Sequence, residues 1–337
     1  MNKNSYYSIK FSDDHLSFLD QTKLPLQEVY VTTDDYERIA VAIEKLELRG
    51  APLIGISAAF ALALSFKNIS DNYKEHFDKI YNRLASTRPT AVNLFYALDR
   101  MKKVFNSIAD HTKTYKTLLD EAIMINSYEE LCSNKIAENG FKIFTKKVNI
   151  LTHCNTGSLA AGGFGTAFAV IKKAYESGYV NHVYADETRP LLQGLRLTSF
   201  ELEKNGIPFT VQTDSMAAVL MQQNKIDLVI TGADRIALNG DSANKIGTYN
   251  LAVLCNYHNI PFYIAAPTTT IDRTIATGDD IKIEYRNSSE ILSINGNQVA
   301  SPDIKTFSPA FDVTPAYLIK GIITEEDVFF FPYNFIR

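Results

Sequence analysis

The sequence predicts an α/β protein, in which a mostly helical amino-terminal domain is followed by a domain with a parallel sheet flanked by helices. The chain has 337 residues, whereas a single hydrophobic core stops growing at about 250 to 300 residues, so two domains are expected. Up to about residue 147, apolar residues recur at helical spacing. Beyond that point, short β-branched runs alternate with segments long enough for crossover helices, which is typical of a parallel sheet.

The first domain is predicted to cover residues 1–125 and the second residues 126–337, on the change of period alone. The first domain begins with SYYSIKF and EVYVTT, which predict a small sheet. ERIAVAIEKLELRG then predicts an amphipathic helix. One face of this helix would carry Ile39, Ala42, Ile43 and Leu46.

The longest apolar run extends from Ala51 to Phe66 and predicts a buried helix. It contains Gly55 and two serines, and it is shorter than the roughly 20 apolar residues that span a bilayer. No membrane segment is therefore expected. The helical spacing continues through residues 92–104 and 118–144, and Gly140 interrupts the second of these segments near its end.

Five apolar runs in the second domain predict strands: VNILTH, VNHVYAD, FTVQ, DLVIT and FYIAA. Helices on both faces of such a sheet would bury it. Ligands of sheets of this kind bind where loops converge, at the carboxyl ends of the strands. Polar residues at those ends are therefore candidates for function.

The composition argues against several classes of protein. A net charge of −4 lacks the basic excess that nucleic-acid binding needs. The amino terminus lacks the apolar region of a secretory signal, and the three cysteines form no CxxC pattern. We therefore expect a cytoplasmic protein without a disulfide framework or a structural metal site.

Cys154 directly follows the first predicted strand, and Gly157 and Ser158 then lead into residues 160–178, which predict a helix. Unpaired N–H groups at a helix start favour a negative charge on a nearby thiol, so Cys154 is a candidate base or nucleophile. A small buried residue that only fills space is an equally good interpretation. His153 would point to the opposite side of the strand, so a pair between these two neighbours is not expected.

Asp234 stands just past the strand DLVIT. Burial there would disfavour its charged form and make it a candidate general acid, although an aspartate that caps a turn is the more common case. Asn244 and Lys245 would open the following helix, where a lysine beside free N–H groups could hold an anion.

Positively charged residues also stand at predicted turns. Arg49 precedes Gly50 at a helix junction, and Arg88 precedes a proline suited to a first helical turn. A further strand-end cluster contains Asp186, Glu187, Arg189 and Gln193. Together these clusters suggest a small phosphorylated ligand with acid/base chemistry beside it. No GxGxxG follows a strand, so a nicotinamide enzyme is not favoured.

Seven stretches carry a resemblance that spans most of the chain: RGAPLIG, RPTAVNLFYALDRM, ILTHCNTGSLA, ADETRPLLQG, GADRIALNGDSANKIGTYNLAVL, APTTTID and FDVTPAYLI. In combination they resemble the signatures of the S-methyl-5-thioribose-1-phosphate isomerase family. Regulatory subunits of the translation initiation exchange factor and ribose-1,5-bisphosphate isomerases are related to it. The resemblance implies a helical domain joined to a Rossmann-like domain, usually in a homodimer.

The same resemblance implies roles for nine residues. The family's catalytic pair falls on Cys154 and Asp234. Its substrate-binding residues fall on Arg49, Gly50, Ala51, Arg88, Gln193, Asn244 and Lys245. Phe200, where tryptophan is common in the family, is a mild departure that leaves these roles intact.

The resemblance also implies the conversion of a cyclic aldose 1-phosphate to an open ketose 1-phosphate in methionine salvage, without a metal or other cofactor. Two alternatives stay open at this point. One is an isomerase of 5-deoxyribose 1-phosphate or ribose 1,5-bisphosphate, because pocket walls distinguish C5 substituents only weakly. The other is a non-catalytic regulatory subunit that binds a sugar phosphate or a nucleotide.

Overall fold

The computed structural model describes residues 5–89, 91–294 and 296–335, and the chain divides into two compact units. Unit 1 contains residues 1–134 and 157–165, and unit 2 contains residues 135–156 and 166–337. The chain thus leaves unit 2 after Thr156 and returns to it at Thr166. The boundary predicted at 125/126 falls within one long helix, α5 (Thr114–Phe141).

Unit 1 combines a three-stranded antiparallel sheet with helices. The strands, in sheet order, are β1 (Ile9–Ser12), β2 (His15–Leu19) and β3 (Tyr30–Thr33). The further helices are α1 (Tyr36–Glu44), α2 (Ala51–Leu64), α3 (Tyr73–Ala85) and α4 (Val92–Ser107). The predicted small sheet and helices are confirmed, and β2 is an additional strand between the two that the sequence indicated.

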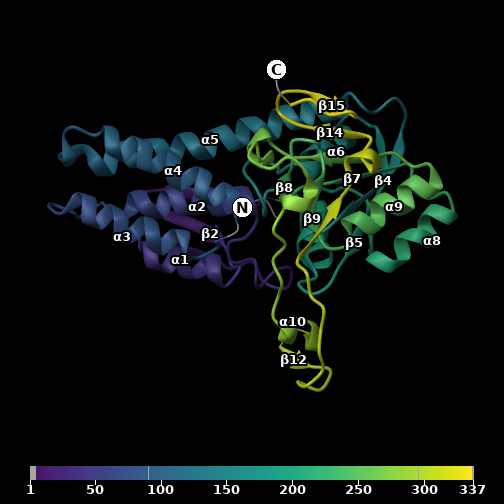
Figure 1. The fold of residues 1–337 in the computed structure, drawn as a ribbon, viewed down its shortest axis with the longest axis horizontal. Coiled ribbons are helices and arrows are strands. Elements are labelled where there is room, and N and C mark those ends of the chain that lie inside the picture. Colours follow the sequence, from purple (N-terminus) through teal and green to yellow (C-terminus); the bar gives the residue numbers. More distant parts are fainter. Residues whose placement is uncertain (1–4, 90, 295, 336–337) are drawn as a thin grey trace. The chain divides into compact units, whose positions relative to one another are not determined.

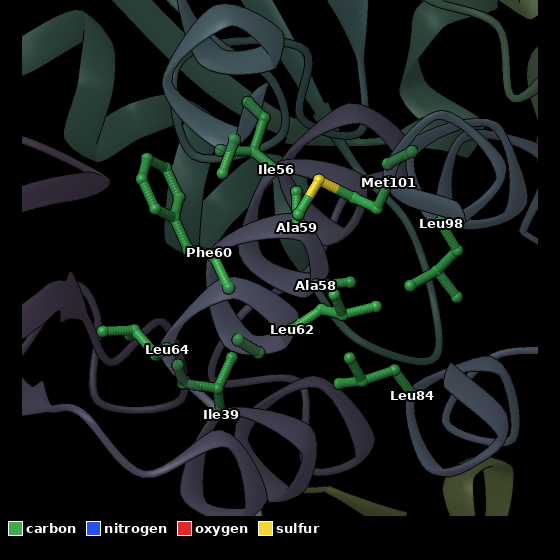
Figure 2. Packing of buried hydrophobic residues seen from close by; sticks show 14 of the residues in the cluster. Ile39, Ile56, Ala58, Ala59, Phe60, Leu62, Leu64, Leu84, Leu98 and Met101 are labelled. Atoms are coloured by element: carbon green, nitrogen blue, oxygen red, sulfur yellow. The ribbon is translucent and has the colours of Figure 1, made fainter. Parts of the chain in front are cut away.

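Helix α2 forms the centre of unit 1. It is apolar on every side, and residues from Leu53 to Leu64 are buried. Figure 2 shows Ile56, Phe60 and Leu62 of α2 among side chains of α1, α3 and α4. A helix that is hydrophobic all round is stable only when it is buried in this way.

The prediction that Leu46 belongs to the apolar face of α1 is wrong. The helix ends at Glu44, and Leu46 takes a left-handed backbone with φ 61°. The chain then turns so that the N–H of Leu48 donates to the carbonyl of Ala42. Leu48, rather than Leu46, is therefore the residue that this turn buries.

Unit 2 contains a seven-stranded sheet, which confirms the predicted parallel sheet. Its order is β15-β14-β10-β7-β4-β5-β6, and every neighbouring pair is parallel except β14 and β15. The strands are β4 (Val148–His153), β5 (Val180–Glu187), β6 (Phe209–Thr213), β7 (Leu228–Thr231), β10 (Phe262–Ala265), β14 (Gly321–Ile323) and β15 (Val328–Phe330). All five predicted strands are present.

Helices cover both faces of this sheet, as successive strand residues point to opposite sides. Ile150 of β4 packs with α6 (Ala167–Glu176) and α7 (Ser199–Lys204). Leu151 packs with α8 (Ala217–Gln222) and α9 (Thr248–His258). Strand β4 therefore contributes to two separate cores.

A smaller sheet and an arm complete unit 2. The small sheet has the order β13-β9-β8, from β8 (Arg235–Ile236), β9 (Ser242–Lys245) and β13 (Phe311–Thr314). The arm, residues 284–309, carries α10 (Ser288–Leu292), β11 (Ser293–Ile294) and β12 (Asn297–Gln298), and it extends away from the large sheet (Figure 1). Single helical turns of the 3-10 type lie at His111–Lys113, Asp214–Met216, Thr268–Thr270, Gly278–Asp280 and Ala316–Leu318. Within the described ranges, no helix is long and apolar enough to cross a membrane.

Candidate functional site

The order of the parallel strands places Cys154 and Asp234 at the same edge of the large sheet in unit 2. Strand β4 comes first in the chain, β5 and β6 extend the sheet to one side, and β7, β10 and β14 extend it to the other. The order reverses between β4 and β7, and ligands of such sheets bind at this switch point. Cys154 directly follows β4, and Asp234 stands three residues after β7.

The loops after these two strands also touch each other. A Cβ atom at Gly232 would lie 2.9 Å from Cγ2 of Thr156. The strands are in parallel register, with Leu151 opposite Val229. Two residues that are far apart in sequence are thus carried by adjacent loops at the carboxyl edge of the sheet.

Cys154 lies in an uncommon backbone conformation and contacts Gln193. Its φ is +60°, a left-handed value that costs a residue other than glycine about 1 to 3 kcal/mol. The side chain is buried, and Sγ donates a hydrogen bond to Oε1 of Gln193 at 3.1 Å. The structure therefore brings together two of the residues that the sequence indicated.

The helix predicted over residues 160–178 is present, but its predicted start is wrong. Helix α6 begins at Ala167, and the N–H of Thr166 donates to the carbonyl of Thr156. The intervening segment passes through unit 1, where a Cβ at Gly162 would lie 2.6 Å from Cβ of Glu129. Gly162 permits a close approach of this segment to helix α5, so the segment does not start a helix. The predicted stabilisation of a thiolate by a helix start therefore has no basis at Cys154.

Asp234 lies next to strand β9 of the small sheet, the strand that carries Asn244. Its N–H donates to the carbonyl of Ala243 at 2.9 Å, and the side chain is partly exposed. Asn244 and Lys245 belong to strand β9, so the prediction that they open a helix is wrong. Helix α9 begins only after Gly247, because β9 pairs with β13 from Ser242 to Lys245.

Lys245 and Asn244 are each held by neighbours. The ammonium group of Lys245 donates to the carbonyl of Ala310 at 3.0 Å and lies 4.6 Å from the ring centroid of Phe311. The Asn244 amide donates to the Thr248 hydroxyl at 3.0 Å. Ala310 and Phe311, which follow the arm in the chain, therefore orient the Lys245 cation on β9, the strand next to Asp234.

A buried pair, His153 and Asp186, lies behind this edge, and the sequence did not indicate it as a pair. His153 Nε2 donates to the carbonyl of Ile246 at 2.9 Å, while Nδ1 lies 3.6 Å from Oδ2 of Asp186. Among the described residues neither Nδ1 nor Oδ2 has a hydrogen-bond partner. Burial raises the pKa of Asp186, although His153 and the amide of Gln212 oppose this effect. His153 is thus engaged away from the thiol, as the alternation of strand side chains predicted.

In unit 1, Arg49, Gly50 and Ala51 form the start of helix α2. Gly50 caps the helix with φ 90°, and a Cβ there would lie 2.2 Å from the carbonyl oxygen of Ala160. The buried Arg49 guanidinium donates through Nε to Gln21. The segment 157–165, which follows the cysteine loop in the chain, is therefore packed directly on Gly50, one of the predicted substrate-binding residues.

Arg88 lies before helix α4 and not within its first turn. The helix begins at Val92 with Ala91 as its cap, so Pro89 stands outside it and the first-turn prediction is wrong. The N–H of Ala91 donates to the Arg88 carbonyl, which closes a turn ahead of the helix. Arg88 is partly buried at this turn.

Another strand-end cation, Arg189, has a structural role that the sequence did not reveal. Its Nη2 donates to three carbonyls at 3.0 Å, those of Glu290, Ile291 and Ser293. Arg189 therefore holds the arm, four residues before Gln193 in the chain. Among the residues that the structure covers, no group of three or more His, Cys, Asp or Glu side chains could hold a metal ion.

The chain is similar to known proteins over most of its length. The pattern of the Initiation factor 2 subunit family matches residues 47–329. A methylthioribose-1-phosphate isomerase of Caldicellulosiruptor saccharolyticus is 51% identical over 330 residues, 96% of this chain and 96% of that protein. The solved structure of 5-methylthioribose 1-phosphate isomerase from Pyrococcus horikoshii OT3 is similar at a TM-score of 0.92 and 38% identity, covering 98% of this chain and 94% of that one.

A structure from A. fulgidus, described as translation initiation factor eIF-2B, subunit delta, has a TM-score of 0.87 at 38% identity and covers 98% of this chain and 97% of that chain. Similar folds thus occur under two functional descriptions. Because the family pattern spans most of the sequence and these relatives match nearly its whole length, the chain belongs to the initiation factor 2 subunit family.

Proposed function

We propose that this protein is an aldose–ketose isomerase that converts S-methyl-5-thioribose 1-phosphate to S-methyl-5-thioribulose 1-phosphate in methionine salvage. The observation that carries the proposal is the position of Cys154 and Asp234 on adjacent loops at the switch point of the sheet. A thiol and a carboxyl group there supply the base and the acid that the reaction needs. The names of close relatives support the same activity.

Asp234 is the acid that opens the sugar ring. A sugar esterified at its anomeric oxygen cannot open by loss of a hydroxyl proton, so the ring oxygen must be protonated as its bond to C1 breaks. Asp234 gives its proton to that oxygen and becomes a carboxylate. The cation left at C1 makes the hydrogen on C2 acidic.

Cys154 then moves a proton from C2 to C1. The thiolate removes the C2 hydrogen, and the electron pair of that bond forms the C1–C2 double bond of an enol. The Asp234 carboxylate takes the proton of the C2 hydroxyl as the ketone forms, and the Cys154 thiol returns its proton to C1. Both groups end in their starting states, so the cycle is balanced.

A direct hydride shift from C2 to C1 is the rival route, in which Asp234 takes the C2 hydroxyl proton. Turnover in deuterated water separates the two, because an enol that exchanges with solvent places deuterium at C1. Complete retention of the substrate hydrogen would favour the hydride shift, although a single shielded base could imitate this result.

The remaining predicted residues hold the substrate. Arg49, Arg88 and Lys245 supply positive charge for the phosphate, and Arg side chains suit the bidentate geometry of such groups. Gly50 and Ala51 offer the start of helix α2, while Gln193 and Asn244 contact sugar hydroxyls. The protein needs no metal or nucleotide in this scheme. We also propose that it works as a homodimer in the cytoplasm.

The decisive test replaces the two reacting groups. Cys154→Ser and Asp234→Asn should abolish turnover while circular dichroism and the unfolding midpoint stay close to those of the parent protein. Asp120→Asn, which neutralises an exposed carboxyl group of α5, serves as the charge-matched control and should leave activity unchanged. Full activity in either site variant would remove this mechanism.

Two measurements separate the alternatives. Kinetics with S-methyl-5-thioribose 1-phosphate, 5-deoxyribose 1-phosphate and ribose 1,5-bisphosphate should give the highest kcat/KM for the first sugar, and a preference for the bisphosphate would overturn the pathway assignment. The similarity to the A. fulgidus chain favours a regulatory subunit as the second candidate. That candidate predicts binding of a sugar phosphate without any conversion.

A further inference from the structure

The backbone of Cys154 needs support that its own sequence does not supply. A left-handed φ is usual for glycine, but Cys154 must keep its side chain if it is to react. Without external contacts the residue would relax to a negative φ, and the direction of its Cα–Cβ bond would change. The hydrogen bond from Sγ to Gln193 would then be lost.

The first such contact comes from Thr198. Its hydroxyl donates to the carbonyl oxygen of Cys154 at 2.5 Å, and the side chain is buried. This bond fixes the peptide that follows Cys154. Because the hydroxyl reaches the main chain and not the thiol, it acts on the orientation of the residue rather than on its chemistry.

The second contact comes from Glu201 through the next residue. Asn155 donates from Nδ2 to Oε2 of Glu201 at 2.5 Å and to the hydroxyl of Thr198 at 3.3 Å. Glu201 lies on α7 and is fully buried. Both sides of the peptide bond between Cys154 and Asn155 are therefore tied to one helical segment.

That segment begins with an uncommon turn. Residues Gly194–Thr198 form a π-helix, η2, and Gln193 is its cap. A π-helix closes hydrogen bonds between residues five apart, so Gln193 and Thr198 can lie on the same side of it, whereas five residues of α-helix would separate them. One turn can thus contact the thiol of Cys154 with Gln193 and its carbonyl with Thr198.

We propose that Thr198 and Glu201 are positioning residues for the isomerase reaction, which hold the left-handed backbone of Cys154 so that Sγ stays directed at Gln193 and the substrate. This inference rests on the proposed function, because it assigns the thiol a reacting role. Neither residue is expected to contact the sugar, since the polar groups of both bond to Cys154 or Asn155. Their loss should therefore slow the chemical step and leave substrate binding nearly intact.

Thr198→Val tests the first contact, since valine keeps the shape and removes the hydroxyl. We expect kcat to fall by about tenfold to a hundredfold, as small misplacements of reacting groups do, with KM changed less than about threefold. A crystal structure of the variant should show a negative φ at residue 154 and no bond from Sγ to Gln193. Thr198→Ser, which restores the hydroxyl, should recover most of kcat.

Ser199→Ala is the matched control. It removes a hydroxyl from the next residue, but that hydroxyl donates to Leu195 within the same segment and does not reach the cysteine peptide. Its kcat should stay within about twofold of the parent protein. Glu201→Met and Glu201→Gln repeat the comparison for the second contact, with glutamine expected to retain the bond from Asn155 and methionine expected to lose it.

Cys154→Ser is measured in the same assay, so that the two proposals fail separately. Full activity of this variant sinks the reacting role of the thiol, and the positioning role with it. If Cys154→Ser is inactive while Thr198→Val and Glu201→Met keep kcat within about twofold, only the positioning proposal is overturned. If Thr198→Val does not fold, Glu201→Met and Glu201→Gln decide by the same criterion.

Discussion

Two turns with a left-handed backbone, one in each unit, carry predicted site residues, and they solve the same conformational problem differently. Gly50, at the start of α2, has φ 90° and no side chain. Cys154, after β4, has φ 60° and a side chain that contacts Gln193. The first turn requires the absence of a Cβ atom, and the second requires its presence.

The difference shows where each turn obtains its stability. At Gly50 the backbone conformation is favourable by itself, and the carbonyl of Ala160 occupies the place of a side chain. At Cys154 a positive φ is unfavourable, so contacts from Thr198 and Glu201 must offset it. A glycine turn is therefore encoded locally, whereas the cysteine turn depends on the tertiary structure around it.

The largest effect is expected for Gly50→Ala. The new Cβ would lie 2.2 Å from the Ala160 oxygen, a distance that main-chain atoms can increase only by moving α2 or the segment 157–165. We expect unit 1 to lose more than about 3 kcal/mol of unfolding free energy, measured by urea denaturation, and turnover to be lost.

Gly178→Ala is the control for this variant. Gly178 has a comparable φ of 82°, but nothing lies within 4 Å of its Cβ position. Only the left-handed backbone is then penalised, by about 1 to 2 kcal/mol. Equal losses in the two variants would show that the contact with Ala160 is unimportant.

A smaller effect is expected when Cys154 is replaced by glycine and by alanine. At an ordinary position glycine is the less stable of the two, but at a left-handed position the order reverses. We expect Cys154→Gly to be more stable than Cys154→Ala by about 1 kcal/mol in urea unfolding, with both variants inactive. The opposite order would mean that this backbone is not strained.

The smallest effect is expected from pH and involves the strand end beside Cys154. Because burial raises the pKa of Asp186, the folded chain holds this proton more tightly than the unfolded chain does. The stability from the protonated carboxyl group is therefore complete below the unfolded pKa, near about 4, and is lost as pH rises through the folded pKa.

Asp186→Asn removes this titration and can keep the bond from Gln212. Relative to the variant, the parent protein should lose up to about 1.4 kcal/mol of unfolding free energy for each pH unit between the two pKa values. Urea unfolding of both proteins between pH 4 and pH 8 measures the difference. A gap that stays constant over this range would contradict the raised pKa.

Much of the fold could be predicted because local patterns determine it. The five β-branched runs became β4, β5, β6, β7 and β10, and the apolar run after Gly50 became the buried helix α2. The missed strands β14 and β15 are three residues long, too short to show a period. The roles of Cys154 and Asp234 stay predictions, although the strand order supports their proximity.

The sequence by itself determined the family, the two kinds of region and the strand ends at which candidate residues stand, because these depend on residue type and on spacing along the chain. Only the tertiary structure decided that Lys245 lies on a strand, since β9 needs the distant β13 as its partner. It also decided that residues 157–165 pack in unit 1 rather than start a helix, and that Cys154 adopts a left-handed backbone. These features depend on contacts between residues far apart in the sequence, which no local pattern records.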